Sequence, residues 1–169
     1  MKGKIIVLVL AGVAIIAASE YAFPVAGALI NFRDSIAISS SILAGPVVGI
    51  IVGLIGGFYR MSMGGWSALP CGLATILASF IGAYLWRYKG YRIKNITSKQ
   101  ILTAIIITGI WEFIHLEIMV PVLGAKPMME AFTIMTNSFL LPMAMMNMLG
   151  TLIILLLGAR AYSHSQKRL

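Results

Sequence analysis

Charged residues are scarce in this chain of 169 residues: Asp, Glu, Lys and Arg make up 11% of it, whereas 60% of the residues are hydrophobic. A soluble domain carries roughly 25% charged residues to cover its surface. The mean hydropathy of +0.96 is equally high. The scarcity of charge excludes a soluble globular protein and indicates an integral membrane protein.

Acidic residues and cysteines are scarcer still. Five Asp and Glu stand against 13 Lys and Arg, which gives a net charge of +8. In a soluble protein this excess suggests nucleic-acid binding. In a membrane protein it reflects the positive-inside rule and contact with anionic headgroups, so we expect the lipid bilayer and no nucleic acid as partner. The single cysteine, Cys71, excludes an intrachain disulfide and a cysteine-based zinc site.

Catalytic motifs are also missing. The sequence contains no Gly-rich phosphate loop, no nucleophile elbow and no paired carboxylates at catalytic spacing. We therefore expect no enzyme activity and no cofactor. There is also no room for a soluble kinase, nucleotide-binding or DNA-binding domain, so residues 1–169 are predicted to form a single transmembrane domain without a soluble output domain.

The chain consists instead of five long apolar blocks, at about residues 5–30, 35–58, 66–86, 100–125 and 128–159. Each block exceeds the roughly 20 residues that cross a hydrocarbon core as a helix. The blocks lack strand-like alternation, and the bilayer offers no hydrogen-bond partner to a lipid-exposed loop. The predicted fold class is therefore all-α, a polytopic helical bundle in the cell membrane.

The distribution of basic residues conflicts with five straight crossings. Residues 87–99 carry five Lys and Arg, and both chain ends are basic too, so the positive-inside rule places all three in the cytoplasm. Three blocks cannot connect two cytoplasmic ends. A break at Gly45-Pro46 resolves the conflict, because proline interrupts a helix and restricts the residue before it. We predict helices at about 34–44 and 46–59 that form a hairpin, hence six helical pieces. The alternative is five straight crossings with an outside N-terminus.

Three stripes of small residues at a spacing of four predict closely packed helices. Internal packing is the favoured interpretation, and the alanine stripe remains open as a docking surface for a partner subunit. The stripes are Ala14, Ala18, Ala22 and Ala26 in the first block; Gly45, Gly49, Gly53 and Gly57 in the second; and Ala74, Ala78 and Gly82 in the third.

Arg33 and Arg60 lie at the two edges of the second block. On one straight helix they would be ~40 Å apart, on opposite membrane faces. With the break at Gly45-Pro46 they converge at one mouth, where two guanidinium groups would bind a carboxylate or phosphate. The alternative is that each arginine anchors a helix end by snorkelling, with Asp34 neutralising Arg33. Spacing alone leaves the two interpretations even.

Two further groups of residues are candidates for ligand contact. Glu112, His115 and Glu117 lie inside the fourth apolar block, where ionisable side chains are costly and indicate function. Glu112 and His115 share a helix face, and a metal site is not expected because only one histidine is available there. Cys71 and Thr75 are one turn apart in the third block. By themselves they favour an ordinary buried thiol and a hydroxyl bonded to its own backbone.

Several motifs, specific only in combination, extend from about residue 20 to residue 160. They are Asn31-Phe-Arg33-Asp34, Gly45-Pro46-Val-Val-Gly49, Gly53-Leu-Ile-Gly-Gly57, Tyr59-Arg60, Gly64-Gly65, Leu73-Ala-Thr75, Glu112 and Pro142-Met-Ala-Met-Met-Asn147-Met-Leu-Gly150. In this combination the chain resembles the transmembrane receptor module of LytS-type sensor histidine kinases.

The resemblance implies a ligand-sensing membrane module. In that family the module precedes a cytoplasmic kinase or other output domain, and its members are linked to extracellular small carboxylates such as pyruvate and to cell-wall regulation. Arg33, Arg60 and Cys71 match positions that the family would use for a small anionic ligand. Asn31, Thr75 and Glu112 belong to the same motifs and complete the set of predicted site residues. Ala74 stands where the family often has serine, so the hydroxyl contact would pass to Thr75.

The chain stops at Leu169, directly after the last apolar block, so we expect a stand-alone or excised module that acts on a separate sensor kinase. The alternative function is the substrate-binding membrane subunit of an energy-coupling-factor transporter, which would dock on other transporter subunits. A helical scaffold without ligand is a third hypothesis, and a homodimer is left open. Neighbouring genes discriminate the first two, since a kinase supports sensing and an ATPase pair supports transport.

Overall fold

The computed structural model describes residues 2–25 and 28–166. Its elements, in chain order, are α1 (Lys2–Glu20), β1 (Phe23–Val25), β2 (Ala28–Ile30), α2 (Arg33–Ala44), α3 (Pro46–Ser62), α4 (Ala68–Tyr88), a 3₁₀ turn (Ile93–Asn95), α5 (Ser98–Ile114), a first π-helical turn (His115–Met119), α6 (Val120–Leu123), α7 (Met128–Ile134), a second π-helical turn (Met135–Phe139) and α8 (Leu140–Gln166). The prediction of an all-α bundle is confirmed, apart from one short hairpin.

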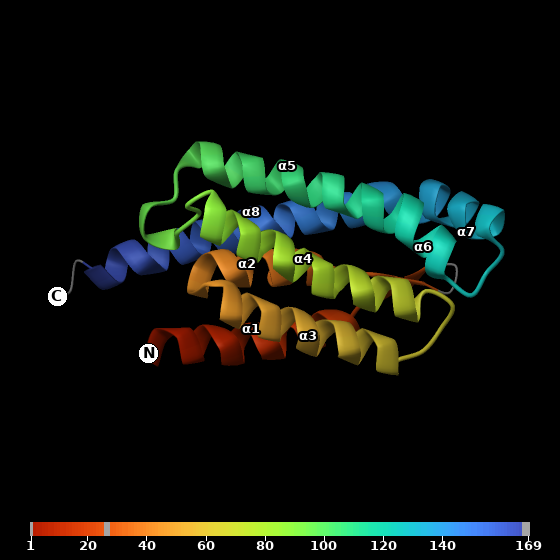
Figure 1. The fold of residues 1–169 in the computed structure, drawn as a ribbon, viewed down its shortest axis with the longest axis horizontal. Helices are drawn as coiled ribbons and strands as arrows, with labels where there is room; N and C mark the ends of the chain where they lie inside the picture. Colours follow the sequence, from red (N-terminus) through yellow and green to blue (C-terminus); the bar gives the residue numbers. More distant parts are fainter. Residues whose placement is uncertain (1, 26–27, 167–169) are drawn as a thin grey trace.

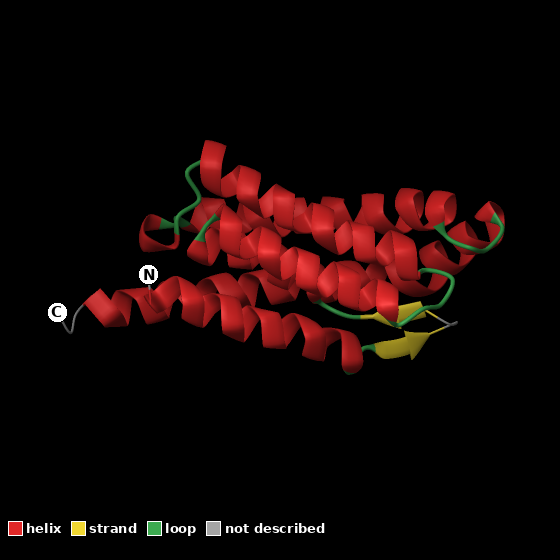
Figure 2. Cartoon of the chain, turned by 60° about the horizontal axis from the view of Figure 1, so that its bottom comes forward, coloured by secondary structure: helices red, strands yellow, loops and turns green. Residues whose placement is uncertain are grey.

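The helices lie side by side along one long axis (Figure 1). The start of α1, the end of α8 and the connection between α4 and α5 lie at one end of the bundle, which we call the terminal end. The two strands and the connections α3–α4 and α6–α7 lie at the other, which we call the hairpin end (Figure 2). Both described chain ends therefore share one end, as predicted; that this end is cytoplasmic stays a prediction.

The lengths of the helices define a multi-pass membrane protein. Four continuous helices are long and apolar enough to cross a membrane: Gly3–Glu20, Ala68–Tyr88, Ser98–Leu123 and Met128–Gln166. The 17 residues of α3 are also apolar and cover ~26 Å as a helix. Among the continuous helical rods formed by the described residues, α2, with 12 residues and ~18 Å, is too short to cross. The bundle thus has five long helical rods and one half-length helix.

The predicted break at Gly45-Pro46 is present. Gly45 has φ +100°, a backbone conformation that other residues rarely adopt, and Pro46 begins α3 in the position where its missing N–H costs nothing. The two helices that meet there pack against each other, and both pack against α4. Their bounds, Arg33–Ala44 and Pro46–Ser62, agree with the predicted 34–44 and 46–59 to within three residues.

Small residues let the three helices of this unit approach closely, as predicted. A methyl group on Gly49 would overlap the Ser41 side chain, and one on Gly82 would lie 2.9 Å from the Ile38 Cα. Ala74 and Ala78 are fully buried on the same side of α4. The glycine stripe of α3 and the alanine–glycine stripe of α4 are therefore internal packing surfaces.

Two π-helical turns interrupt the fourth and fifth apolar blocks, each shortly before a proline. The first, His115–Met119, precedes Pro121, and the second, Met135–Phe139, precedes Pro142. Proline cannot donate to the carbonyl four residues earlier, and its ring crowds that carbonyl, so a local widening of the helix accommodates it. The first widened turn begins at His115, which is buried in the protein interior.

The first apolar block differs from the prediction. Its helix ends at Glu20, and Phe23–Val25 pairs with Ala28–Ile30 in an antiparallel hairpin. The expected alanine stripe along one helix is therefore wrong at Ala22, which follows the helix, while Ala26 lies outside the described residues. The hairpin buries Ala28 and Ile30 against the hairpin end of the bundle. Phe23 in the first strand stays 63% exposed at this end.

Helix α2 occupies the centre of the bundle. It packs against α1, α3, α4 and α8, and eleven of its twelve residues are buried. Its sequence is polar for such a position, with one arginine, one aspartate and four serines. Buried polar side chains at membrane depth are costly and indicate function. Since α2 is half-length, its first residue, Arg33, lies well inside the bundle rather than at a surface.

Two asparagines hold the start of α2. Asn31 Oδ1 accepts a hydrogen bond from the Arg33 amide (3.0 Å), and Asn147 Oδ1 on α8 accepts one from the Ser35 amide (2.9 Å). Asn147 Nδ2 also donates to the Asn31 carbonyl at 3.0 Å. These bonds satisfy backbone groups that a helix start leaves free.

Replacement of Asn147 with alanine is expected to destabilise the chain by about 1–3 kcal/mol, because it leaves a buried amide and a buried carbonyl without partners. Thermal or denaturant unfolding in detergent, followed by circular dichroism, measures this. Asn137→Ala is the matched control, since Asn137 is exposed on the same helical rod. Equal stability of the two variants would contradict the role assigned to Asn147.

Candidate ligand site

Arg33 and Arg60 are both buried at the hairpin half of the bundle. Arg33 begins α2 and is 1% exposed; Arg60 lies in the last turn of α3 and is 2% exposed. The bend at Gly45 returns the chain antiparallel to itself, so both arginines lie in the same half of the bundle.

The hydrogen bonds of the two guanidinium groups go to neutral partners. Arg33 Nη1 donates to Ser19 Oγ on α1 at 3.3 Å. Arg60 donates to the Gly64 carbonyl at 2.8 Å and to Ser67 Oγ at 3.1 Å. The Nε atoms of both arginines are buried without any hydrogen-bond partner. Within residues 2–25 and 28–166, no carboxylate lies within 4.0 Å of either guanidinium. Both charges are thus buried and lack a contact ion pair.

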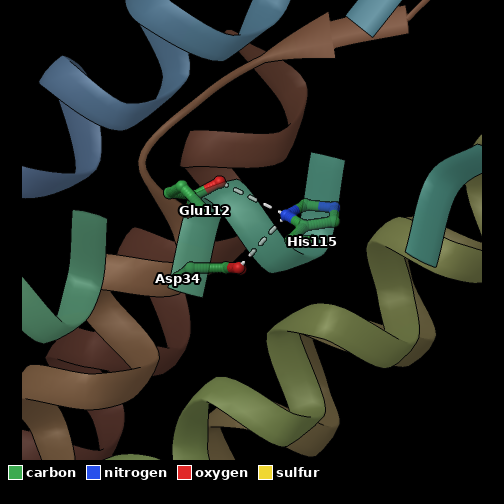
Figure 3. Close-up of side chains that lie close together, drawn as sticks. All are labelled: Asp34, Glu112 and His115. Carbon is green, nitrogen blue, oxygen red and sulfur yellow. Dashed lines mark hydrogen bonds and ion pairs between the residues drawn. The ribbon is translucent and has the colours of Figure 1, made fainter. Parts of the chain in front are cut away.

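The nearest carboxylate in sequence, Asp34, has other partners. Asp34 Oδ1 accepts from Thr75 Oγ1 at 2.7 Å, and Oδ2 accepts from Trp111 Nε1 at 3.0 Å. His115 Nδ1 lies 3.5 Å from Asp34 Oδ2 (Figure 3). Asp34 therefore links α2 to α4 and α5, and it is not the contact partner of Arg33 that sequence reasoning had considered.

Glu112 and His115 complete this buried group, as their shared helix face predicted. Figure 3 shows the carboxylates of Asp34 and Glu112 both pointing toward the His115 ring, with His115 Nδ1 3.3 Å from Glu112 Oε2. Glu112 Oε1 and His115 Nε2 are buried without a hydrogen-bond partner. We call Asp34, Glu112 and His115 the acid–histidine cluster. Glu117 lies apart from it and accepts a hydrogen bond from Thr136 at 2.7 Å.

The acid–histidine cluster brings together donor atoms that can ligate a metal ion, one from each side chain, all within 4.8 Å of one another. In the structure these atoms satisfy one another, because the imidazole nitrogen is shared between the two carboxylates. The sequence-based expectation of no metal stays a prediction.

Cys71 and Thr75, one turn apart on α4, contribute differently. The Cys71 thiol is buried. The Thr75 hydroxyl is directed to Asp34 and to the Cys71 carbonyl. Of the six predicted site residues, Arg33, Arg60, Cys71 and Glu112 are all buried, and that they bind one ligand stays a prediction. Thr75 orients Asp34, and Asn31 has its side chain bound to the backbone around the start of α2.

Comparison with known proteins gives the family. The family model described as the 5TMR of 5TMR-LYT matches residues 1–160. This chain belongs to the 5TMR-LYT family. The resemblance to LytS-type receptors is therefore confirmed. The family name refers to five transmembrane segments, and the fold has five long helical rods together with the half-length α2.

Relatives of the 5TMR-LYT chain are sensor kinases. The sensor histidine kinase BtsS of Escherichia coli K12 is 32% identical over 120 residues, which are 71% of this chain and 21% of BtsS. The sensor protein LytS of Bacillus cereus is 34% identical over 119 residues, 69% of this chain and 18% of LytS. YpdA of Escherichia coli K12, another sensor histidine kinase, is 44% identical over 64 residues, 37% of this chain and 11% of YpdA. No solved structure matches the chain.

The 5TMR-LYT chain spans about a fifth of the length of these curated relatives, and the matches cover their transmembrane receptor region. The family assignment and the apolar helices together define a multi-pass membrane protein of the receptor type.

Sequence reasoning missed several partners in this 5TMR-LYT site. Ser19 and Ser67, which bind the two arginines, lie on α1 and before α4, and serines in apolar runs carry no distinguishing signal. The links of Asp34 to Trp111 and Thr75 connect residues 77 and 41 positions apart. One pattern could have suggested Asp34 as a site residue: it lies in the first turn of α2, and this helix is buried.

Proposed function

We propose that this chain is the ligand-sensing module of a membrane signal receptor and that it binds a small carboxylate, such as pyruvate, between Arg33 and Arg60. The chief support is that both guanidinium groups are buried and lack a contact carboxylate among the described residues. Removing an unpaired charge from water costs several kcal/mol. An anion that enters between the two groups recovers part of this cost through charge-assisted hydrogen bonds.

The free donors favour a carboxylate. Arg33 Nε and Arg60 Nε have no partner, and both belong to planar forks that match the two oxygens of a carboxylate. Arg33 also begins α2, whose N-terminus carries a partial positive charge. A half-length helix that points its N-terminus into a membrane bundle is an arrangement in which transport proteins hold anionic substrates.

Neutral side chains surround the arginines. Ser19 binds Arg33, Ser67 binds Arg60, and the β-hairpin covers the same end of the bundle. Asp34 is held away by Thr75 and Trp111, so the arginines keep their charge for a guest. We expect the guest to be a carboxylate of a few carbon atoms, with the buried thiol of Cys71 as a contact for its non-ionic part.

Binding would signal by changing how the helices pack. A ligand that joins Arg33 to Arg60 would draw the starts of α2 and α4 and the end of α3 together, while Asp34 transmits the movement to α5. Asn147 connects the start of α2 to α8, whose last residues lie at the terminal end. The equilibrium shifts only by the difference in ligand affinity between the two packings. A separate sensor kinase would read the position of α8.

Titration calorimetry tests the proposal directly. We expect the purified chain in nanodiscs to bind pyruvate, and Arg33→Ala and Arg60→Ala each to lose at least about 30-fold in affinity, as truncation of a buried charge partner does. Methyl pyruvate, which lacks the charge, is expected not to bind. Arg160→Ala, at an exposed position of α8, is the matched control and should bind like the wild type.

Thermal unfolding of each variant verifies that it is folded. Equal affinities in the wild type and in both arginine variants would refute the two-arginine site. Negligible heats with pyruvate and with other small carboxylates in all folded variants would favour a scaffold without ligand.

A further inference from the structure

A hollow at the terminal end combines three basic side chains with an apolar floor. It has a cavity volume of about 410 Å³ and lies between the start of α1, the end of α2 and the segment after α4. Lys4, Arg92 and Lys94 line it together with Val7, Leu43 and Trp86. Lys4 and Lys94 are exposed, and the Arg92 guanidinium lies over the Trp86 ring, 3.1 Å from its centroid. Three cationic side chains therefore line this hollow, and one of them is stacked on an aromatic ring.

These cations have no acidic residue near them. All five Asp and Glu of the chain lie in the other half of the bundle: Glu20 ends α1, Asp34 begins α2, Glu112 and Glu117 lie 14 and 19 residues beyond the start of α5, and Glu130 is in α7. Among the described residues, the ion pairs are confined to those distant groups. The charge at this end of the bundle therefore has to be balanced by an anion from outside the described chain.

The basic hollow continues into an apolar crevice. A second hollow of about 230 Å³ shares Val7 and Leu43 with the first and runs between α1, α2 and α8. It is lined by Leu10, Ala11, Ala14, Ile36 and Ile154, with Ser40 as the one polar residue in its wall. Charge at the mouth and hydrocarbon below it form one continuous groove on the lipid-facing side of α1.

The length of the groove matches a lipid chain. From Lys4 to Ala14 the groove follows ten residues of α1, or ~15 Å along the helix axis. This is about half the ~30 Å thickness of the hydrocarbon core, the depth of one leaflet. A free phosphate or nucleotide would satisfy the cations and leave the crevice empty. A zwitterionic lipid would fill the crevice without supplying net negative charge.

We propose that this groove is a binding site for one anionic phospholipid. Its phosphate headgroup is held by Lys4, Arg92 and Lys94, and an acyl chain lies in the crevice between α1 and α8. Arg92 is positioned for this by its stacking on Trp86, which fixes the guanidinium at the mouth. The lipid occupies the space that side chains leave empty between α1 and the rest of the bundle. The site lies at the opposite end from Arg60, and it is independent of the proposed carboxylate site.

Native mass spectrometry of the detergent-solubilised full chain tests the site with phosphatidylglycerol and phosphatidylcholine of identical acyl chains. We expect the wild type to retain phosphatidylglycerol at least tenfold more strongly than phosphatidylcholine. The double variant Lys4→Gln/Lys94→Gln should lose this preference. Lys89→Gln/Lys99→Gln removes the same charge at the same end, from exposed residues that do not line the groove, and should keep it.

Ala11→Phe tests the crevice separately, because the ring would occupy the path of the acyl chain while the cations remain. We expect it to lose most of the retained phosphatidylglycerol and to unfold at the same temperature as the wild type. Equal retention of the two lipids by the wild type would overturn the proposal. Equal losses in the two lysine double variants would also overturn it, since they would indicate general surface attraction. Undiminished retention in Ala11→Phe would overturn the assignment of the crevice.

Discussion

Replacing Asp34 with alanine is expected to destabilise the folded chain by about 2–5 kcal/mol, because three side chains would lose this carboxylate as a partner. The Thr75 hydroxyl, the Trp111 indole N–H and the His115 ring all direct a polar atom at it. Thr75 and His115 are buried and Trp111 is half-buried, so water has little access to replace the lost oxygen atoms. The loss is larger than for an ordinary hydrogen bond, because a buried histidine next to Glu112 also loses one of its two acidic neighbours.

Denaturant unfolding in detergent measures the Asp34 effect. Asp34→Asn separates hydrogen bonding from volume, because the amide has nearly the same size but presents an NH₂ group to at least one donor. We expect it to be destabilised as well. Glu130→Ala is the matched carboxylate control, as Glu130 is exposed and pairs only with Lys126. Wild-type stability of Asp34→Asn would show that the carboxylate is not the link between α2, α4 and α5.

A double-mutant cycle with Thr75→Val makes the prediction sharper. If the Thr75 hydroxyl stabilises the chain through Asp34, the two substitutions are not additive, and the second costs less than it does alone. Additive losses would mean that Thr75 acts through its other bond, to the Cys71 carbonyl.

The two buried arginines and the acid–histidine cluster together explain why a polar helix is at the centre of a membrane bundle. Arg33 and Asp34 are adjacent in sequence, yet they face different neighbours: Asp34 binds donors on α4 and α5, and Arg33 binds a serine on α1. A direct Arg33–Asp34 pair would be self-sufficient. Their separation leaves the Arg33 guanidinium without a carboxylate in contact, which is what the proposed carboxylate site requires.

The sequence was sufficient for the features that local chemistry determines. Pro46 requires a break in the helix, and the glycines of α3 allow close packing of the helices. If the basic segment 87–99 and the N-terminus lie on the same side of the membrane, the chain between them must cross it an even number of times. All of these constraints act within a few residues or through charge. They led to the hairpin, and through the hairpin to the common location of Arg33 and Arg60.

The features that the sequence did not reveal depend on tertiary contacts. Residues 21–30 are as apolar as a helix, and only their position beneath the bundle end makes Phe23–Val25 and Ala28–Ile30 a hairpin. Short apolar runs of this kind cannot be assigned by periodicity. The central place of α2 was not predicted either, because it depends on the contacts of this helix with α1, α4 and α8.

The packing of α4 against α2 gives the second large effect. Gly82→Val is expected to abolish stable folding, because a side chain there would overlap the backbone carbonyl of Ile38 and would also meet the Ser41 Cβ at 2.9 Å. Backbone cannot move aside as the end of a flexible side chain can. The only relief is to separate α4 from α2, which would open the contact between Thr75 and Asp34 on the same pair of helices.

Gly12→Ala is the matched control, because the nearest atom to an added methyl group at this position of α1 is Ile55 Cδ1, at 3.8 Å. Alanine should be neutral there or stabilise the helix by roughly 0.5–1 kcal/mol. Size-exclusion chromatography and circular dichroism in detergent would then give a folded peak for Gly12→Ala and aggregation or a strongly lowered melting temperature for Gly82→Val. A folded Gly82→Val chain of wild-type stability would mean that α2 and α4 lie farther apart than the structure has them. The short distance between Asp34 and Thr75, and with it the argument that Asp34 is withheld from Arg33, would then have to be abandoned.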